Sequence, residues 1–199
     1  MLFRSLGTAP PEYVHHGLIL GADGKKLSKR AEGATVDSLR DAGIPAEAVR
    51  AYLEELGLPK HDVHLDLARI RRLAIEAIEA MSDDALAARV GADPQYAPVM
   101  RGARDLNEAV EYALQLEHPG TGWKPVPADV PTLTRFKELA DLPPKDLIRE
   151  LRAAGGNLKA LRLALTGRDK GPELSAILAA LPKEETLRRV DQALQHAQP

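Results

Sequence analysis

The sequence has no cysteine in its 199 residues, and aromatic residues make up only 4% of the chain. The lack of cysteine excludes disulfide bonds, cysteine-containing zinc sites and thiol catalysis. It is consistent with a reducing compartment, so we expect a cytoplasmic protein. With so few aromatic side chains, a core must be built from Leu, Ala, Ile and Val. This composition favours helices over a β-sandwich.

Long apolar runs and an excess of one charge are also absent. No run approaches the roughly 20 apolar residues that a membrane-spanning helix needs, so we expect no membrane partner. The start of the chain lacks the charged and long apolar segments of a secretory signal. The 27 basic and 29 acidic residues give a net charge of −2, so the chain as a whole lacks the basic footprint of a DNA-binding protein. Any nucleic-acid site must therefore be a local cluster of cations.

Helical spacing of apolar residues dominates the chain from residue 35 onward. Thr35, Ser82 and Asn157 each precede such a segment and can cap a helix N-terminus. Gly91 follows one segment and can end its helix. The only predicted strand lies around residues 14–20. The sequence therefore predicts an all-α protein with at most a short strand or hairpin before the lysine-rich loop.

The helical chain divides into four predicted regions. Residues 1–57 end with a helix whose apolar face would hold Val49, Tyr52, Leu53 and Leu56. Residues 58–118 form a helical connecting region, and residues 132–199 form a helical tail. Between them, residues 119–131 (PGTGWKPVPADVP) contain four prolines and two glycines and are predicted to be a linker. Trp123 is interpreted as a plug that packs this linker against a helix.

Catalytic patterns are few. The phosphate-binding patterns GxGxxG and GxxxxGKS are both absent. His61 and His64 are three residues apart, as metal ligands on a helix can be, but they precede the next helix and no HExxH pattern accompanies them. We interpret them as solvent-facing loop histidines and predict no metal site. The paired acids Asp83 and Asp84 lie at a helix start, where the helix dipole favours negative charge.

One loop has the composition of a phosphate-binding segment. Residues 25–30 (KKLSKR) contain four basic residues in six and follow Gly24, which can act as a hinge. Lysines on such a loop can approach a polyphosphate and stabilise the charge that develops on its oxygens. From composition alone, a solvated basic turn or a short basic targeting signal is the favoured interpretation.

The residues around this loop resemble a known family. Residues 16–30 (HGLILGADGKKLSKR) are similar to the second signature of class I aminoacyl-tRNA synthetases, the KMSKS loop, here in the form KLSKR. The preceding residues resemble glutamyl-tRNA synthetases in particular, through LFRSLG at residues 2–7 and through Pro11, Tyr13 and His15. Gly17 departs from the family, which commonly has a proline there.

Further similar segments follow in the family's order. Residues 43–49 and 52–57 resemble its first helices beyond the catalytic domain, whereas residues 67–123 match more weakly. The segments that resemble the anticodon-binding tail are residues 158–167 (LKALRLALTG), 171–174 (GPEL) and 183–189 (KEETLRR). The family's first signature, the HIGH-type sequence, and most strands of its nucleotide-binding fold are missing from this sequence.

The resemblance implies a role in ATP-dependent glutamylation of tRNA. In this reaction ATP activates glutamate as an adenylate with loss of pyrophosphate, and the terminal ribose hydroxyl of tRNA then attacks the adenylate. The implied catalytic residues are Lys26, Ser28 and Lys29. The implied ATP-phosphate-binding residues are Lys26, Leu27, Ser28, Lys29 and Arg30. Mg²⁺ would arrive with ATP, without a dedicated protein site.

The resemblance also implies that the helical remainder binds tRNA. Lys159, Arg162 and Thr166 are the predicted contacts, with phosphates bound by cations and single-stranded bases read by polar groups. Arg168 and Lys170 add basic charge nearby. A second basic cluster is interpreted as a solvated helix face; its members are Arg69, Arg71 and Arg72.

Two hypotheses from different classes remain at this point. In the first, the chain is the C-terminal portion of a glutamate–tRNA ligase, and it is inactive without an N-terminal half that binds ATP and glutamate. In the second, it is a stand-alone tRNA-binding or regulatory module derived from such an enzyme. The intact KLSKR loop favours the first hypothesis, and the missing nucleotide-binding fold favours the second for the chain in isolation.

Overall fold

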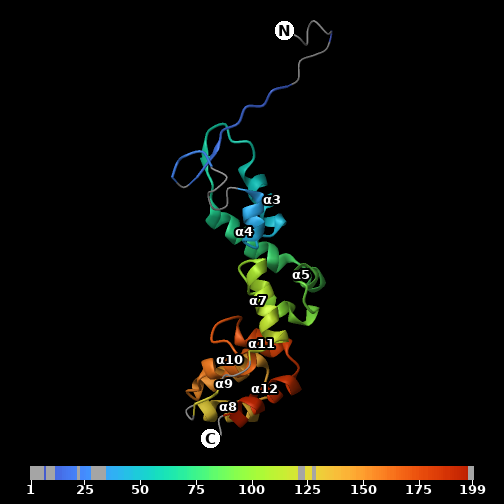
Figure 1. Ribbon diagram of the computed structural model, residues 1–199, viewed down its shortest axis with the longest axis vertical. Coiled ribbons are helices and arrows are strands. Elements are labelled where there is room, and N and C mark those ends of the chain that lie inside the picture. The colour runs from blue at the N-terminus through green and yellow to red at the C-terminus, as the bar shows by residue number, and fades with distance from the viewer. Residues whose placement is uncertain are drawn as a thin grey trace.

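The computed structural model describes residues 7, 12–21, 23–27, 35–120, 124–126 and 129–196. Helices dominate these residues, and the two strands have two residues each, so the predicted all-α class is confirmed. The helices are arranged along one long axis, from α3 and α4 through α5 and α7 to the tail helices α8–α12 (Figure 1). None of the helices in the described part of the chain is long and apolar enough to cross a membrane.

The first unit combines a small sheet with three helices. Thr35 caps its first helix, because its side chain accepts a hydrogen bond from the Ser38 N–H at 3.0 Å. The core of the unit is centred on Ile70 and Ala74, which are 1% and 0% exposed. The elements in chain order are β1 (Ile19–Leu20), α2 (Val36–Asp41), α3 (Ala46–Leu56), β2 (Val63–His64) and α4 (Leu67–Ala80).

The second unit is built around small apolar residues. Ser82 caps its first helix, and Gly91 ends that helix in the left-handed conformation with φ +79°, both as predicted. Its core contains Ile78, Leu86 and Met100, each 0% exposed. Its elements are α5 (Asp83–Val90), the 3-10 turn η1 (Pro94–Tyr96), α6 (Ala97–Met100) and α7 (Leu106–Glu117).

The third unit is the helical tail. Asn157 caps one of its helices through bonds from the N–H groups of Lys159 and Ala160, as predicted. Its core also takes in Val99 of α6 and Leu116 of α7, so the tail packs directly against the second unit. The tail elements are α8 (Val130–Glu138), α9 (Pro144–Ala153), α10 (Leu158–Thr166), α11 (Leu174–Ala180) and α12 (Lys183–His196).

The structure differs from the sequence expectations at several places. Strand β2 was not predicted; it pairs in parallel with β1, with Ile19 opposite Val63 and Leu20 opposite His64. Leu53 was assigned to the apolar face of α3 but is 49% exposed. The remaining difference concerns the predicted linker.

The end of the predicted linker is part of the folded tail. Helix α8 begins at Val130, and Asp129 before it is only 6% exposed. The Asp129 carboxylate accepts hydrogen bonds from the side-chain amide of Asn157 at 2.8 Å and from the Val126 N–H at 3.1 Å. These bonds tie the segment before α8 to the start of α10. Trp123 lies outside the described residues.

Candidate functional site

The lysine loop starts from a tight turn at the end of β1. The Gly21 N–H donates to the Lys25 carbonyl at 2.8 Å, and the Gly24 N–H donates to the Gly21 carbonyl at 3.0 Å. Gly24 has φ +73°, a conformation that favours glycine. The turn exposes Lys25 and Lys26 and leaves Leu27 partly buried. Of the predicted phosphate-binding residues, Ser28, Lys29 and Arg30 lie outside the described residues.

Residues 59–65 hold this turn to the first helical core. The Leu18 N–H donates to the Asp62 carboxylate at 2.8 Å. The carbonyls of Leu18 and Leu20 accept from the N–H groups of Val63 and Leu65, each at 2.9 Å. Strand β1 carries the lysine turn, and it is bonded to residues 63–65. Because α4 begins at Leu67, directly after this segment, β1 is attached to a rigid helix.

The structure explains why residue 17 is a glycine, although the resembled family commonly has a proline at this position. Its N–H donates to the Pro59 carbonyl at 2.7 Å, a bond that proline cannot donate. A Cβ atom at Gly17 would lie 2.1 Å from the His61 carbonyl oxygen. Glycine therefore permits both the hydrogen bond and the close approach of the two segments.

His61 and His64 are solvent-exposed, as interpreted from the sequence. His64 lies beside the lysine turn, because a Cβ atom built on Gly24 would be 3.8 Å from its Nε2 atom. Within the described ranges, no three His, Cys, Asp or Glu side chains are grouped as metal ligands.

The predicted tRNA-binding residues of the tail lie on α10. Lys159 is exposed, and its Nζ atom is 3.2 Å from the Asp169 carboxylate; the hydrogen bond from Lys159 lowers the pKa of Asp169. Arg162 is partly buried, and its guanidinium donates to the Pro172 carbonyl. Burial lowers the pKa of Arg162. Both side chains line a hollow of about 310 Å³ beside Leu174, so the structure brings these two residues together.

Thr166, the third predicted contact, is 0% exposed. Its hydroxyl donates to the Arg162 carbonyl at 2.9 Å and accepts from the Arg168 N–H at 3.2 Å. The hydroxyl therefore shapes the turn after α10, and direct contact with RNA would require these bonds to break. A contact between Thr166 and tRNA stays a prediction.

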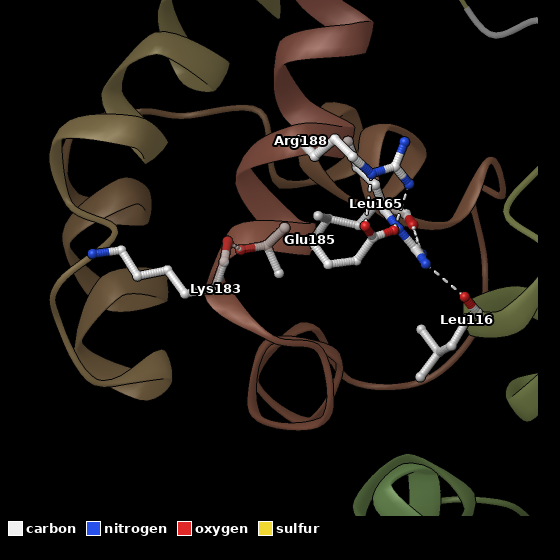
Figure 2. A network of polar contacts seen from close by, with 7 residues as sticks. Leu116, Leu165, Lys183, Glu185 and Arg188 are labelled. Atoms are coloured by element: carbon white, nitrogen blue, oxygen red, sulfur yellow. Dashed lines mark hydrogen bonds and ion pairs between the residues drawn. The ribbon is translucent and has the colours of Figure 1, made fainter. Parts of the chain in front are cut away.

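The sequence reasoning missed Arg189, a buried cation that joins two helix ends. Figure 2 labels its three partners, Leu116, Leu165 and Glu185. Its guanidinium donates to the carbonyls of Leu116, at the end of α7, and Leu165, near the end of α10, each at 2.6 Å. Its Nε atom donates to Glu185 at 2.6 Å. The signal in the sequence is weak, since Arg189 is distinguished only by its helical spacing from the buried Ala193.

The Glu185 carboxylate also accepts hydrogen bonds from a second arginine. Arg188 donates two hydrogen bonds to its carboxylate, at 2.6 and 2.7 Å. These bonds and the one from Arg189 lower the pKa of Glu185 to about 2. The carboxylate therefore stays charged over the physiological pH range, as its role in neutralising Arg189 requires.

In the second basic cluster, Arg69 is paired with two acids of the same unit. Arg69 lies 2.5 Å from the Glu55 carboxylate and 3.3 Å from that of Glu76. Its neighbour Arg72 is exposed. This arrangement agrees with the interpretation of a solvated helix face.

Known proteins are similar to this chain at two levels: one protein family matches the tail, and individual relatives match nearly the whole chain. Residues 145–194 match the family described as "Anticodon binding domain". The chain is 30% identical, over 94% of its length, to Glutamate--tRNA ligase 1 of Chelativorans sp. (strain BNC1). It is 32% identical, over 95% of its length, to Glutamate--tRNA ligase 2 of Methylobacterium sp. (strain 4-46). These alignments run over 240 and 234 residues, more than the 199 of this chain, so the relatives contain segments that it lacks.

A solved structure shares the fold. The crystal structure of a glutamate tRNA ligase from Elizabethkingia meningosepticum matches with a TM-score of 0.67 and 20% identity, over 98% of this chain and 53% of that one. The chain spans about half the length of the curated relatives it matches, 50% and 51% for the two named above. Over nearly its whole length, this chain is homologous to the C-terminal half of glutamate–tRNA ligases, including their anticodon-binding domain.

Proposed function

We propose that this chain contributes the lysine loop and the tRNA-binding helices to ATP-dependent glutamylation of tRNA. The observation that carries this proposal is the homology to glutamate–tRNA ligases over 94% of the chain, in which the KLSKR sequence is intact. The substrates are glutamate, ATP with its Mg²⁺, and a glutamate-type tRNA. ATP and glutamate bind only together with an N-terminal catalytic half, because the described residues form just one two-stranded sheet.

The lysine loop acts on the ATP phosphates. Lys26 and Lys29 supply positive charge as negative charge develops on the leaving pyrophosphate, and Ser28 donates a hydrogen bond. Leu27 and Arg30 flank these groups on the same loop. The attachment of β1 to β2 supports this role, because a charged loop is effective only when its base is held in place.

The tail binds tRNA through α10. Lys159 is exposed and can exchange Asp169 for a phosphate, and each such contact releases a counterion from the RNA. Arg162 has five N–H donors, of which one group is held by Pro172, so its orientation is fixed before RNA arrives. Thr166 keeps the turn beside them in place.

The second candidate function is a stand-alone tRNA-binding module without catalysis. The observation in its favour is that the tail has its own core, formed mainly by α8–α12. Such a core lets the tail hold its shape independently of a nucleotide site.

Reconstitution of charging distinguishes the two functions. We expect residues 1–199 alone to form no glutamyl-adenylate, and to support tRNA charging when mixed with an N-terminal catalytic half carrying the HIGH-type signature. The measurement is radiolabelled glutamate on tRNA, with heat-inactivated chain as the control. Charging by the chain alone would contradict the requirement for a second half, and tRNA binding with no charging in the mixture would favour the binding module.

A further inference from the structure

A cavity of about 360 Å³ lies between α2, α4 and the residues that precede α7. This volume falls within the range of about 300–1,000 Å³ that is typical of small-ligand sites. We propose that this cavity, called the α2 cavity below, binds a small amphipathic carboxylate, with the apolar chain inside and the carboxylate at an arginine of the rim. The inference goes beyond the proposed function and does not depend on tRNA binding.

The inner wall of the α2 cavity is apolar. Leu39 of α2, Ile44 of the following turn and Ile70 of α4 line it, and they are 8%, 9% and 1% exposed. All three belong to the core of the first unit. The other apolar lining residues are Ala42, Leu67 and Ile75. Water in such a space finds few polar partners, so an apolar chain can replace it favourably.

One cation at the cavity is held in place with a donor to spare. Arg104 lines the cavity, and its Nε and Nη2 atoms donate to the Glu108 carboxylate at 3.0 and 2.9 Å. Its Nη1 group has no hydrogen-bond partner among the described residues. The bonds to Glu108 fix the orientation of the guanidinium, and a group that is already ordered loses less entropy when it binds. The Nη1 group can therefore donate to a bound carboxylate.

The other polar lining groups favour an anion over a cation. Two arginines line the cavity, Arg71 and Arg104, against one acid, Asp105. Asp105 caps α7, since its carboxylate accepts from the Glu108 N–H at 2.8 Å. The Ser38 hydroxyl is likewise used within the protein, because it donates to the Thr35 carbonyl at 2.8 Å. An ammonium group in the cavity would face two positive charges, whereas a carboxylate would be attracted by them.

A ligand in this position would add to the packing of α2. This helix has six residues, and Leu39 is its only buried one. So short a helix has little stability of its own. Its end is already joined to α7, because the Asp41 carbonyl accepts from the Asn107 side-chain amide at 2.9 Å and the Gly43 carbonyl from the Leu106 N–H at 2.8 Å. A chain in the cavity would contact α2 and α4 together and hold α2 in place.

The test measures binding of octanoate to the full 199-residue chain by isothermal titration calorimetry. A chain of this size suits 360 Å³, which is roughly twelve times the volume of one water in the liquid. Octanol and octylamine carry the same chain with a neutral and a positive head. We expect octylamine to bind about tenfold more weakly than octanoate. We also expect octanoate to slow hydrogen exchange in α2 and to leave exchange in the tail unchanged.

Two substitutions separate the head from the chain. We expect Arg104→Gln to weaken octanoate binding about tenfold, because a hydrogen bond from a charged group is lost, and to leave octanol binding unchanged. Unchanged octanol binding would also show that the cavity is intact in this variant. Ala42→Leu should weaken the binding of both ligands about tenfold, because the added side chain occupies the space of the ligand chain.

Arg72→Gln is the matched control, since Arg72 is an exposed arginine of α4 that does not line the cavity. It should leave the affinity for octanoate unchanged. Failure of octanoate to bind, or binding that Ala42→Leu does not weaken, would overturn the site. Equal binding of octanoate and octylamine, or equal effects of the two arginine substitutions, would overturn the choice of a carboxylate. The altered side chains are all exposed, so circular dichroism should show unchanged folding.

Discussion

Arg189 is the residue on which the junction between the second unit and the tail depends. It is 6% exposed and serves three acceptors, two of them carbonyls near the C-terminal ends of helices. The last carbonyls of a helix have no partner within the helix, and a buried one needs a donor from elsewhere. A positive charge is also favourable at the negative end of the helix dipole. One side chain therefore satisfies α7 and α10 together.

Removing this side chain should destabilise the protein strongly. We expect Arg189→Met to lower the free energy of unfolding by about 3 kcal/mol, because it leaves two buried carbonyls without donors. The measurement is urea denaturation followed by circular dichroism. Arg188→Met is the control, since Arg188 is exposed and solvent screens its pair with Glu185, so we expect a much smaller loss of stability. Similar losses in the two variants would contradict the role assigned to Arg189.

Glu185 gives this junction a pH dependence. Its pKa in the folded protein is about 2, lowered from 4.5 chiefly by the hydrogen bonds from Arg188. A lowered pKa means that the stabilisation is present above pH 4.5 and is lost as the pH falls from about 4.5 towards 2. We expect Glu185→Gln to flatten the stability profile in this window, measured by thermal unfolding at successive pH values. A profile parallel to that of the unmodified protein would contradict this prediction.

At the scale of elements, the lysine turn depends on a two-residue strand pairing. Strands this short have little stability of their own, and β1 gains most of its order from the bonds to residues 59–65. Gly17 is one point at which the two segments approach closely. The position of the lysine turn is thus set by a contact with the helical body.

Gly17→Ala should loosen this attachment. The new Cβ atom would lie 2.1 Å from the His61 carbonyl oxygen, so one of the two segments must move. We expect hydrogen exchange at the Val63 and Leu65 amides to accelerate about tenfold, while exchange within the tail stays unchanged. Gly102→Ala is the matched control, because its new Cβ atom would meet nothing closer than 3.6 Å. Unchanged exchange at both amides would show that the close approach does not hold the turn.

At the scale of the whole molecule, the proposed phosphate loop and the proposed tRNA site lie at opposite ends. The β1–β2 region belongs to the first unit, and α10 belongs to the tail, with α5 and α7 between them (Figure 1). The proposed contacts with the ATP phosphates and with tRNA are therefore made at different ends of the chain.

This separation predicts different effects of substitutions at the two ends. We expect Arg162→Ala and Lys159→Ala to weaken tRNA binding to the chain and to reduce its salt dependence, because each lost phosphate contact removes about one released counterion. Lys29→Ala should leave that binding largely unchanged. In the reconstituted enzyme the Lys29 variant should lower kcat roughly 10²–10³-fold, as expected for loss of a single transition-state donor.

Filter binding at several salt concentrations, followed by charging assays, checks this division. Equal effects of the Lys29 and Arg162 substitutions on tRNA binding would contradict it. Charging that is unaffected by Lys29→Ala would reduce the KLSKR loop to an ancestral remnant and favour the stand-alone binding module.

The sequence by itself determined the features that depend on neighbouring residues. The caps at Thr35, Ser82 and Asn157 were predicted because a cap bonds to N–H groups two or three residues away. Helical class followed from apolar periodicity, and homology to glutamate–tRNA ligases was visible in contiguous segments such as KLSKR. Each of these signals lies within a few turns of the chain.

The tertiary structure alone decided the features that join distant residues. The Leu18–Asp62 bond spans 44 positions and the Leu116–Arg189 bond spans 73, and no local pattern specifies such partners. For the same reason the structure alone revealed that Thr166 is buried and that Arg189 joins the ends of α7 and α10. Both features depend on how α7, α10 and α12 pack, and packing is a property of the assembled core rather than of any one helix.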